Sequence, residues 1–143
     1  MKDDALFCVG QKAFIDRDGK VLVLYDPTDG LDFPGGKIQE GEAKEGDPDS
    51  LKRSLQREVL EETGLEIEVG SPFVVWYYEF SKGHRNYPKV VYLVGFKCRY
   101  ISGDVTLSDE HDNFSWVDQG DYVQVDDKSD YFDALGAYFQ EGK

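Results

Sequence analysis

The chain alternates short apolar stretches with groups of turn residues. Stretches of apolar, aromatic and β-branched residues predict strands at residues 6–15, 20–25, 66–69, 73–80 and 89–100. The first two are separated by Asp-Arg-Asp-Gly at 16–19, which indicates a β-hairpin. Residues 108–117 form an acidic loop that runs into a further short strand. Strands therefore make up most of the regular structure that the pattern predicts.

Two stretches have helical spacing instead. The first is expected between Asp47 and Leu65, with Asp47 as N-cap and Gly64 as a left-handed C-cap. The second, 129–140, has Ser129 as a possible cap and an apolar stripe made of Tyr131, Leu135, Tyr138 and Phe139. Strands with helices on both sides predict an α/β protein with a mixed sheet between helices.

The apolar stripe of the first helix turns acidic halfway along. Leu51 and Leu55 are followed at the same spacing by Glu58 and Glu62, and Glu61 lies beside them. At about 100° per residue these three glutamates fall within an arc of roughly 100°, so they can point at one place. A divalent cation would offset their repulsion. A glutamate cluster alone is more typical of a solvated helix face, and the flanking residues decide between the two.

The residues around this helix resemble the Nudix box. Upstream lie Phe-Pro-Gly-Gly-Lys at 33–37 and then Glu42, and the helix contains Arg-Glu-Val-Leu-Glu-Glu-Thr-Gly-Leu at 57–65. The family pattern is Gly, five residues, Glu, seven residues, then Arg-Glu-apolar-x-Glu-Glu-x-Gly-apolar, and the specified residues are all present here, with Gly36 as the first. Between Glu42 and Arg57 there are 14 residues instead of seven. We expect the insertion, within 43–50, to be an exposed loop that leaves the acidic register unchanged.

The resemblance implies a Nudix-type α/β/α sandwich and metal-dependent hydrolysis of a nucleoside diphosphate linked to another group. By analogy with the family, the expected cofactor is Mg²⁺ or Mn²⁺, and the expected ligands are Glu58, Glu61, Glu62, the Gly35 carbonyl and Glu110. Glu110 lies six residues before Trp116, a spacing that resembles a fourth carboxylate found outside the box. Arg57 would orient a carboxylate and Lys37 would lie near the phosphates. Glu58 and Glu110 both remain candidates for the general base.

Substrate contacts are expected from a second region. Residues 81–88 form a basic loop in an acidic protein, and Arg85 in this loop is a candidate for substrate binding, although an ordinary solvated hairpin is an equal alternative. Of the aromatic residues Trp76, Tyr77 and Tyr78, one or two could stack on a base, and we take Tyr77 as the candidate. Core packing is the alternative for each of them.

Composition and charge narrow the class of protein. The 143 residues, 40% hydrophobic and 14% aromatic, predict a single domain over 1–143 with a substantial core. A net charge of −13 argues against nucleic acid or an anionic membrane as partner, and a bound cation would let such a chain accept phosphates. Cys8 and Cys98 are expected to be buried free thiols. The N-terminal residues do not resemble a signal peptide, so we expect a soluble cytoplasmic protein, monomeric or homodimeric.

The substrate is less sharply defined. Some ADP-ribose-hydrolysing relatives have a proline about fifteen residues after the box, where this chain has Phe80, and the tyrosine of some dinucleoside-polyphosphate enzymes is also missing. A MutT-like nucleoside triphosphate pyrophosphatase is therefore the favoured hypothesis. The alternatives are an ADP-ribose or nucleotide-sugar pyrophosphatase and a nucleotide-sensing binding module without catalysis.

Overall fold

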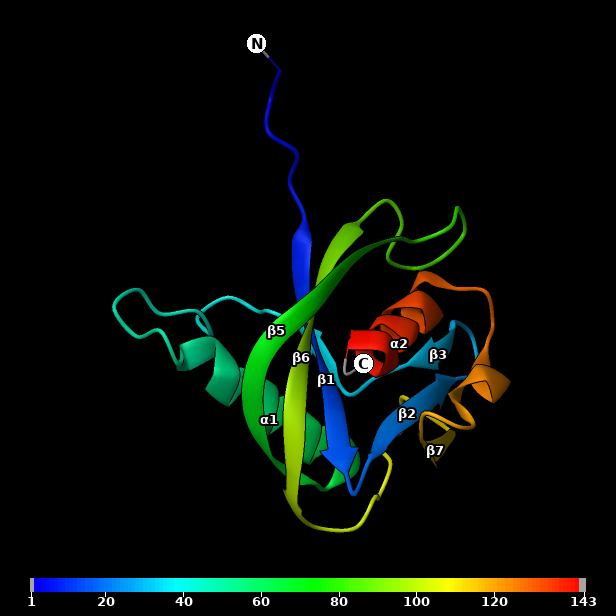
Figure 1. Ribbon diagram of the computed structural model, residues 1–143. Helices are drawn as coiled ribbons and strands as arrows, with labels where there is room; N and C mark the ends of the chain where they lie inside the picture. Colours follow the sequence, from blue (N-terminus) through cyan, green and yellow to red (C-terminus); the bar gives the residue numbers. More distant parts are fainter. Residues whose placement is uncertain (1, 142–143) are drawn as a thin grey trace.

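The computed structural model describes residues 2–141 and contains one mixed sheet between two helices (Figure 1). The elements in chain order are β1 (Cys8–Arg17), β2 (Lys20–Asp26), β3 (Gly30–Asp32), β4 (Gly35–Lys37), α1 (Ser50–Thr63), β5 (Glu66–Glu79), β6 (Val90–Ser102), β7 (Asn113–Val117), the 3₁₀ turn η1 (Tyr122–Val125) and α2 (Asp130–Glu141). The sheet order is β3-β2-β1-β6-β5, with β4 paired to β1 and β7 paired to β2. Among the strand pairings within residues 2–141, only that of β1 with β6 is parallel. The predicted α/β/α sandwich with a mixed sheet is confirmed.

Each face of the sheet packs against one helix. In β1, Ala13 and Ile15 lie in one apolar cluster with Leu55 of α1, whereas Phe14 lies in a second cluster with Leu135 of α2. These five side chains are fully buried, and each of the large apolar ones contributes about 1.5–3 kcal/mol of transfer free energy. Because both faces of the sheet are covered, residues 13–15 of β1 and 21–24 of β2 are apolar on both faces.

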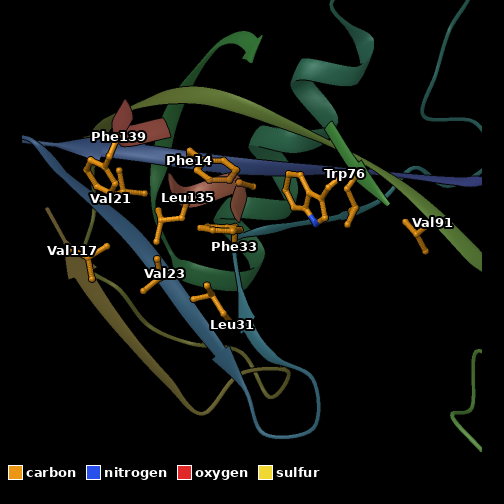
Figure 2. Packing of buried hydrophobic residues seen from close by; sticks show 12 residues of the cluster. Phe14, Val21, Val23, Leu31, Phe33, Trp76, Val91, Val117, Leu135 and Phe139 are labelled. Carbon is orange, nitrogen blue, oxygen red and sulfur yellow. The ribbon is translucent and has the colours of Figure 1, made fainter. Parts of the chain in front are cut away.

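The core on the α2 side holds the glycine-rich segment in place. In Figure 2, Phe14 and Phe33 lie between Leu135 and Trp76, and the Phe14 and Phe33 rings are stacked with centroids 4.1 Å apart. Trp76 is 8% exposed, so core packing is the correct interpretation for this residue. Because Phe33 stands two residues before Gly35, this packing anchors the start of β4.

Several predicted strand boundaries are wrong, for identifiable reasons. Asp16 and Arg17 pair with Val21 and Lys20, so β1 extends to Arg17 and the turn is confined to residues 18–19. The segments 66–69 and 73–80 are a single strand, β5, because Pro72 sits at a register shift instead of ending the strand. The bulge also moves the apolar side of β5 to the opposite face of the sheet, from the α1 cluster to the α2 cluster.

The helix ends are partly as expected. Helix α1 begins at Ser50 with Asp49 as N-cap, so the cap is two residues later than predicted, because the Asp47 carboxylate pairs with the Arg53 guanidinium instead of capping. Gly64 is a left-handed C-cap with φ of 76°, and its N–H donates to the Leu60 carbonyl at 2.9 Å, as predicted. Helix α2 begins at Asp130, and the Phe132 N–H donates to Ser129 Oγ at 3.2 Å, so the predicted cap is confirmed.

The insertion before α1 is an exposed loop, as expected. Residues 43–49 are exposed apart from half-buried Asp47. The loop is closed at its base by Glu42, whose carboxylate accepts the Gln39 N–H at 2.5 Å, the Arg57 guanidinium at 2.5 Å and the Ser54 hydroxyl. We call this arrangement the Glu42 clamp. The acidic end of α1 therefore keeps its position despite the added length.

The cysteines and the membrane prediction complete the fold. Cys98 is buried, and desolvation raises the pKa of its thiol to about 12, whereas Cys8 is only half-buried, so its predicted burial is overstated. Both are free thiols. Within residues 2–141, neither helix has the length and apolar character needed to cross a bilayer.

Candidate metal and substrate site

A cavity of about 1280 Å³ opens between the acidic end of α1 and the loop that follows β5. Its walls come from β1, the segment from β2 to β4, helix α1, residues 81–86, residues 108–111 and one tyrosine of α2. Cavities of this size accommodate nucleotide-sized ligands.

The innermost wall is a buried charge network made of Lys12, Asp32 and His111. Lys12 Nζ lies 3.0 Å from Asp32 Oδ1, and His111 Nε2 lies 2.9 Å from Asp32 Oδ2. Burial alone would raise the pKa of Asp32, but Lys12 and the hydrogen bond from His111 outweigh it and hold that pKa below its ordinary value. Burial disfavours the charged form of Lys12, and Asp32 reverses this, so the Lys12 pKa is raised. Asp32 is therefore held as a carboxylate.

Two glutamates of α1 point at the glycine strand β4. Glu62 Oε2 accepts the Gly35 N–H at 3.2 Å. Glu58 lies against Gly36 so closely that a Cβ on this glycine would be 2.1 Å from Glu58 Oε2, and a side chain at position 36 would displace the Glu58 carboxylate. Burial raises the pKa of both carboxyls to about 7, reinforced by Glu42 for Glu58 and opposed by Lys12 for Glu62. These two acids lack a sufficient counter-charge.

The third glutamate of the helix is held elsewhere. Arg57 donates from one terminal nitrogen to Glu61 Oε1 and Oε2 at 2.9 and 3.0 Å, and from the other to Glu42. The Glu61 side chain is 61% exposed. Arg57 thus orients carboxylates, as predicted, but the structure does not bring Glu61 together with Glu62.

A compact group of possible metal ligands forms where α1 faces residues 108–111. One ligand atom each from Glu62, Glu110 and His111 lie within 4.8 Å of one another. Glu58 Oε1 and His111 Nδ1 nearby are buried and have no hydrogen-bond partner among residues 2–141. Carboxylate oxygens together with an imidazole nitrogen are a donor set that divalent cations accept, so these residues fit a metal ion. Glu110 lies where the sequence placed it, whereas His111 was not anticipated. The predicted Gly35 carbonyl ligand stays a prediction.

The predicted substrate contacts divide into two groups. Lys37 and Arg85 both line the cavity, and Lys37 Nζ lies 5.7 Å from the centre of the Phe80 ring. Tyr77 does not line it, and its prediction as a stacking residue is wrong: its ring contacts Phe7 edge-on with centroids 5.7 Å apart. The next residue, Tyr78, lines the cavity instead, because neighbouring residues of a strand face opposite sides of the sheet.

The raised pKa values of Glu58 and Glu62 predict how the metal-free protein responds to pH. A carboxyl with a folded pKa of about 7 and an ordinary value of 4.5 favours the folded state at low pH, and this advantage is lost as pH rises through 7. Lowering the pH from about 8 to about 6 should therefore stabilise the metal-free protein by about 1 kcal/mol through Glu62 and by less through Glu58, which solvent screens more, or by several degrees in Tm.

Calorimetric melting at both pH values measures this effect. Saturating Mg²⁺ should remove most of the pH dependence, because the cation stabilises the ionised carboxylates. The control is the double variant Glu58→Gln/Glu62→Gln, which should show the smaller pH dependence without added metal. Equal pH dependence in wild type and double variant would contradict the assigned environment of these two residues.

Comparisons with known proteins agree with this geometry. A family model described as NUDIX domain matches residues 12–135. The nucleoside triphosphatase NudI of Klebsiella pneumoniae subsp. pneumoniae is 26% identical over 119 residues, which cover 78% of this chain and 82% of that protein. Among solved structures, the MutT protein of Methanosarcina mazei Go1 superimposes with a TM-score of 0.75 at 26% identity over 99% of this chain and 98% of that one. A NUDIX hydrolase of Nitrosomonas europaea shares the fold, with a TM-score of 0.71 at 19% identity over 96% and 91%.

Proposed function

The chain belongs to the NUDIX domain family and is a hydrolase of pyrophosphate bonds, and from this premise we propose that it cleaves nucleoside triphosphates with the help of Mg²⁺ or Mn²⁺. The observation that carries the proposal is the grouping of Glu62 and Glu110 with His111 in a nucleotide-sized cavity that Glu58 also lines. The nucleoside triphosphatase name of the Klebsiella relative supports the substrate class. Such an acidic site needs a cation before it can accept a triphosphate.

The proposed ligands are Glu58, Glu61, Glu62, Glu110 and the Gly35 carbonyl. A bound divalent cation supplies charge neutralisation for the phosphates and lowers the pKa of water in the site. The chain itself positions these groups: β4 fixes Glu62 through the Gly35 N–H, and Arg57 fixes Glu61. Phosphoryl-type transfer needs mainly such positioning and charge stabilisation and does not require a side-chain nucleophile.

Glu58 is the residue that we propose as general base. The other candidate, Glu110, has its carboxylate grouped with Glu62 and His111, which favours a ligand role. Glu58 stands apart from that group, lines the cavity, and has one oxygen without a hydrogen-bond partner among residues 2–141. In this role its carboxylate accepts the proton of the water that attacks phosphorus.

Positive side chains are proposed to hold the triphosphate. Lys37 follows Gly36 on β4, Arg85 lies in the loop after β5, and both line the cavity. In a chain with a net charge of −13, two cations that line the same cavity support a role in binding phosphates. Tyr78, which replaces Tyr77 as the aromatic residue of the cavity, is proposed to contact the base.

We also propose a cytoplasmic location and a small nucleotide as the main partner, with the chain acting as a monomer or homodimer. The acidic net charge supports this, because nucleic acids and anionic membranes bind net basic surfaces.

A substrate panel tests the proposed function. Nucleoside triphosphates, ADP-ribose, nucleotide sugars and dinucleoside polyphosphates are incubated with the protein and Mg²⁺ or Mn²⁺, and released phosphate, pyrophosphate and nucleoside monophosphate are measured. We expect kcat/KM for at least one nucleoside triphosphate to exceed that for the other classes by about tenfold or more, a ratio of about 1.4 kcal/mol in transition-state stabilisation. Glu62→Gln, purified in parallel, controls for contaminating phosphatases. A preference for ADP-ribose or nucleotide sugars would contradict the substrate class.

A further inference from the structure

His111 is a buried side chain with one nitrogen that has no partner. The residue is 7% exposed, and its Nε2 lies 2.9 Å from Asp32 Oδ2. The other nitrogen, Nδ1, is buried and forms no hydrogen bond within residues 2–141. A buried polar atom left without a partner costs about 1–3 kcal/mol, so this arrangement calls for an explanation.

The hydrogen bond to Asp32 determines which nitrogen is the acceptor. Asp32 also contacts Lys12 at 3.0 Å and is held as a carboxylate, which can only accept hydrogen bonds. Nε2 must therefore carry the hydrogen, and in the neutral ring the lone pair is on Nδ1. This is the tautomer of a metal-binding histidine whose second nitrogen donates to a carboxylate.

The surroundings of His111 contain suitable companions. A carboxylate oxygen of Glu62, a carboxylate oxygen of Glu110 and a ring nitrogen of His111 lie within 4.8 Å of one another. Glu62 comes from α1, whereas Glu110 and His111 are neighbours in the loop before β7. Two oxygens and one nitrogen from two segments thus face a common point, next to the buried Asp32–Lys12 pair.

We propose that His111 is a ligand, through Nδ1, of a divalent cation that Glu62 and Glu110 also hold, and that the site consequently prefers Mn²⁺ to Mg²⁺. Imidazole is a good ligand for transition metals, whereas Mg²⁺ strongly favours oxygen. Asp32 is a positioning residue that sets the ring orientation, and Lys12 keeps Asp32 in place. This inference rests on the proposed metal dependence but adds a nitrogen ligand to it.

Pulsed electron paramagnetic resonance of bound Mn²⁺ tests the ligand directly. The full chain is stripped of metal, loaded with less than one equivalent of Mn²⁺, and examined for ¹⁴N coupling of a directly bound imidazole. The chain has two histidines, so the signal can be assigned. We expect the coupling in wild type and in the matched control His84→Gln, and its loss in His111→Gln. Titration calorimetry should show the Mn²⁺ Kd rising by about 10–100-fold in His111→Gln, and the Mg²⁺ Kd changing by much less.

A second version of the experiment needs no substitution, in case His111→Gln does not fold. Wild type with ¹⁵N-labelled histidine should replace the ¹⁴N pattern by that of ¹⁵N. Bound Mn²⁺ without nitrogen coupling in wild type, or with coupling that persists in folded His111→Gln, would overturn the inference. Turnover of nucleotides in the substrate panel would leave the proposed function standing in that case. Nitrogen coupling in a protein that turns over no nucleotide would overturn the proposed function alone.

Discussion

Glu62→Gln is expected to remove most turnover while leaving the protein folded and, without metal, slightly more stable. The amide oxygen of glutamine can still accept the Gly35 N–H, so the contact between α1 and β4 is kept. What disappears is a negative charge at the centre of the proposed metal site. We expect kcat at saturating metal to fall on the order of a hundredfold or more, because loss or displacement of a ligand disturbs the reacting geometry. At about pH 8 the metal-free variant should gain about 1 kcal/mol, because burial raises the pKa of this carboxyl to about 7.

The matched control for this prediction is Glu68→Gln. Glu68 is an exposed residue of β5 that pairs with Arg99 at 3.1 Å, so the same chemical change is made far from the cavity. Its kcat should stay within about twofold of wild type, because exposed ion pairs contribute little. Circular dichroism, calorimetric melting and steady-state kinetics are measured for both variants. Near-normal turnover of Glu62→Gln at saturating Mg²⁺, or loss of its fold, would show that the role assigned to Glu62 is wrong.

Gly35→Ala is expected to cause the largest loss of stability. Gly35 has φ of 140°, a conformation that side chains rarely adopt, and an added Cβ would lie 2.0 Å from the backbone oxygen of Gln11. Backbone cannot yield as a flexible side chain would, so β4 must separate from β1. Conformational strain and overpacking each cost about 1–3 kcal/mol, and together we expect a loss of about 3–5 kcal/mol.

Urea denaturation of Gly35→Ala and Gly136→Ala compares this position with a permissive one. An alanine at Gly136 in α2 meets no atom of the described chain within 4 Å, and alanine is the better helix former, so this control should keep or gain up to about 1 kcal/mol. Gly35→Ala should also lose activity even where it remains folded, because Glu62 loses the N–H that positions it. Similar unfolding free energies for the two variants would exclude the close approach of β4 to β1.

The sequence predicts the helix part of the site well because that part depends on local spacing. Glu58 and Glu62 lie on successive turns of the same helix, and Gly64 ends that helix through its own left-handed backbone conformation. The Lys12–Asp32–His111 network could not be predicted in this way. Asp32 and His111 are 79 residues apart, and only the pairing of β2 with both β3 and β7 brings their segments together.

The error at Tyr77 has a different cause. The aromatic run at 76–78 does not indicate which tyrosine faces the cavity. The facing residues of β5 depend on the register shifts around Pro72. An inserted residue reverses the face of every side chain after it. A bulge of this kind has only a weak sequence signal, here Gly-Ser-Pro at 70–72, which also resembles a loop. The tyrosine on the cavity side is therefore its neighbour, Tyr78.

The Glu42 clamp explains why the number of residues between Glu42 and Arg57 can vary. Because the Glu42 carboxylate meets the Arg57 guanidinium and the Ser54 hydroxyl, the two ends of the intervening segment adjoin in space whatever its length. The motif therefore requires that Glu42 and Arg57 meet in space, and it does not require a fixed number of residues between them. A motif search with one fixed spacer length would overlook this chain. Because these contacts hold the acidic half of α1, a foreign peptide can be inserted within residues 43–49 for display or labelling without moving that half of the helix.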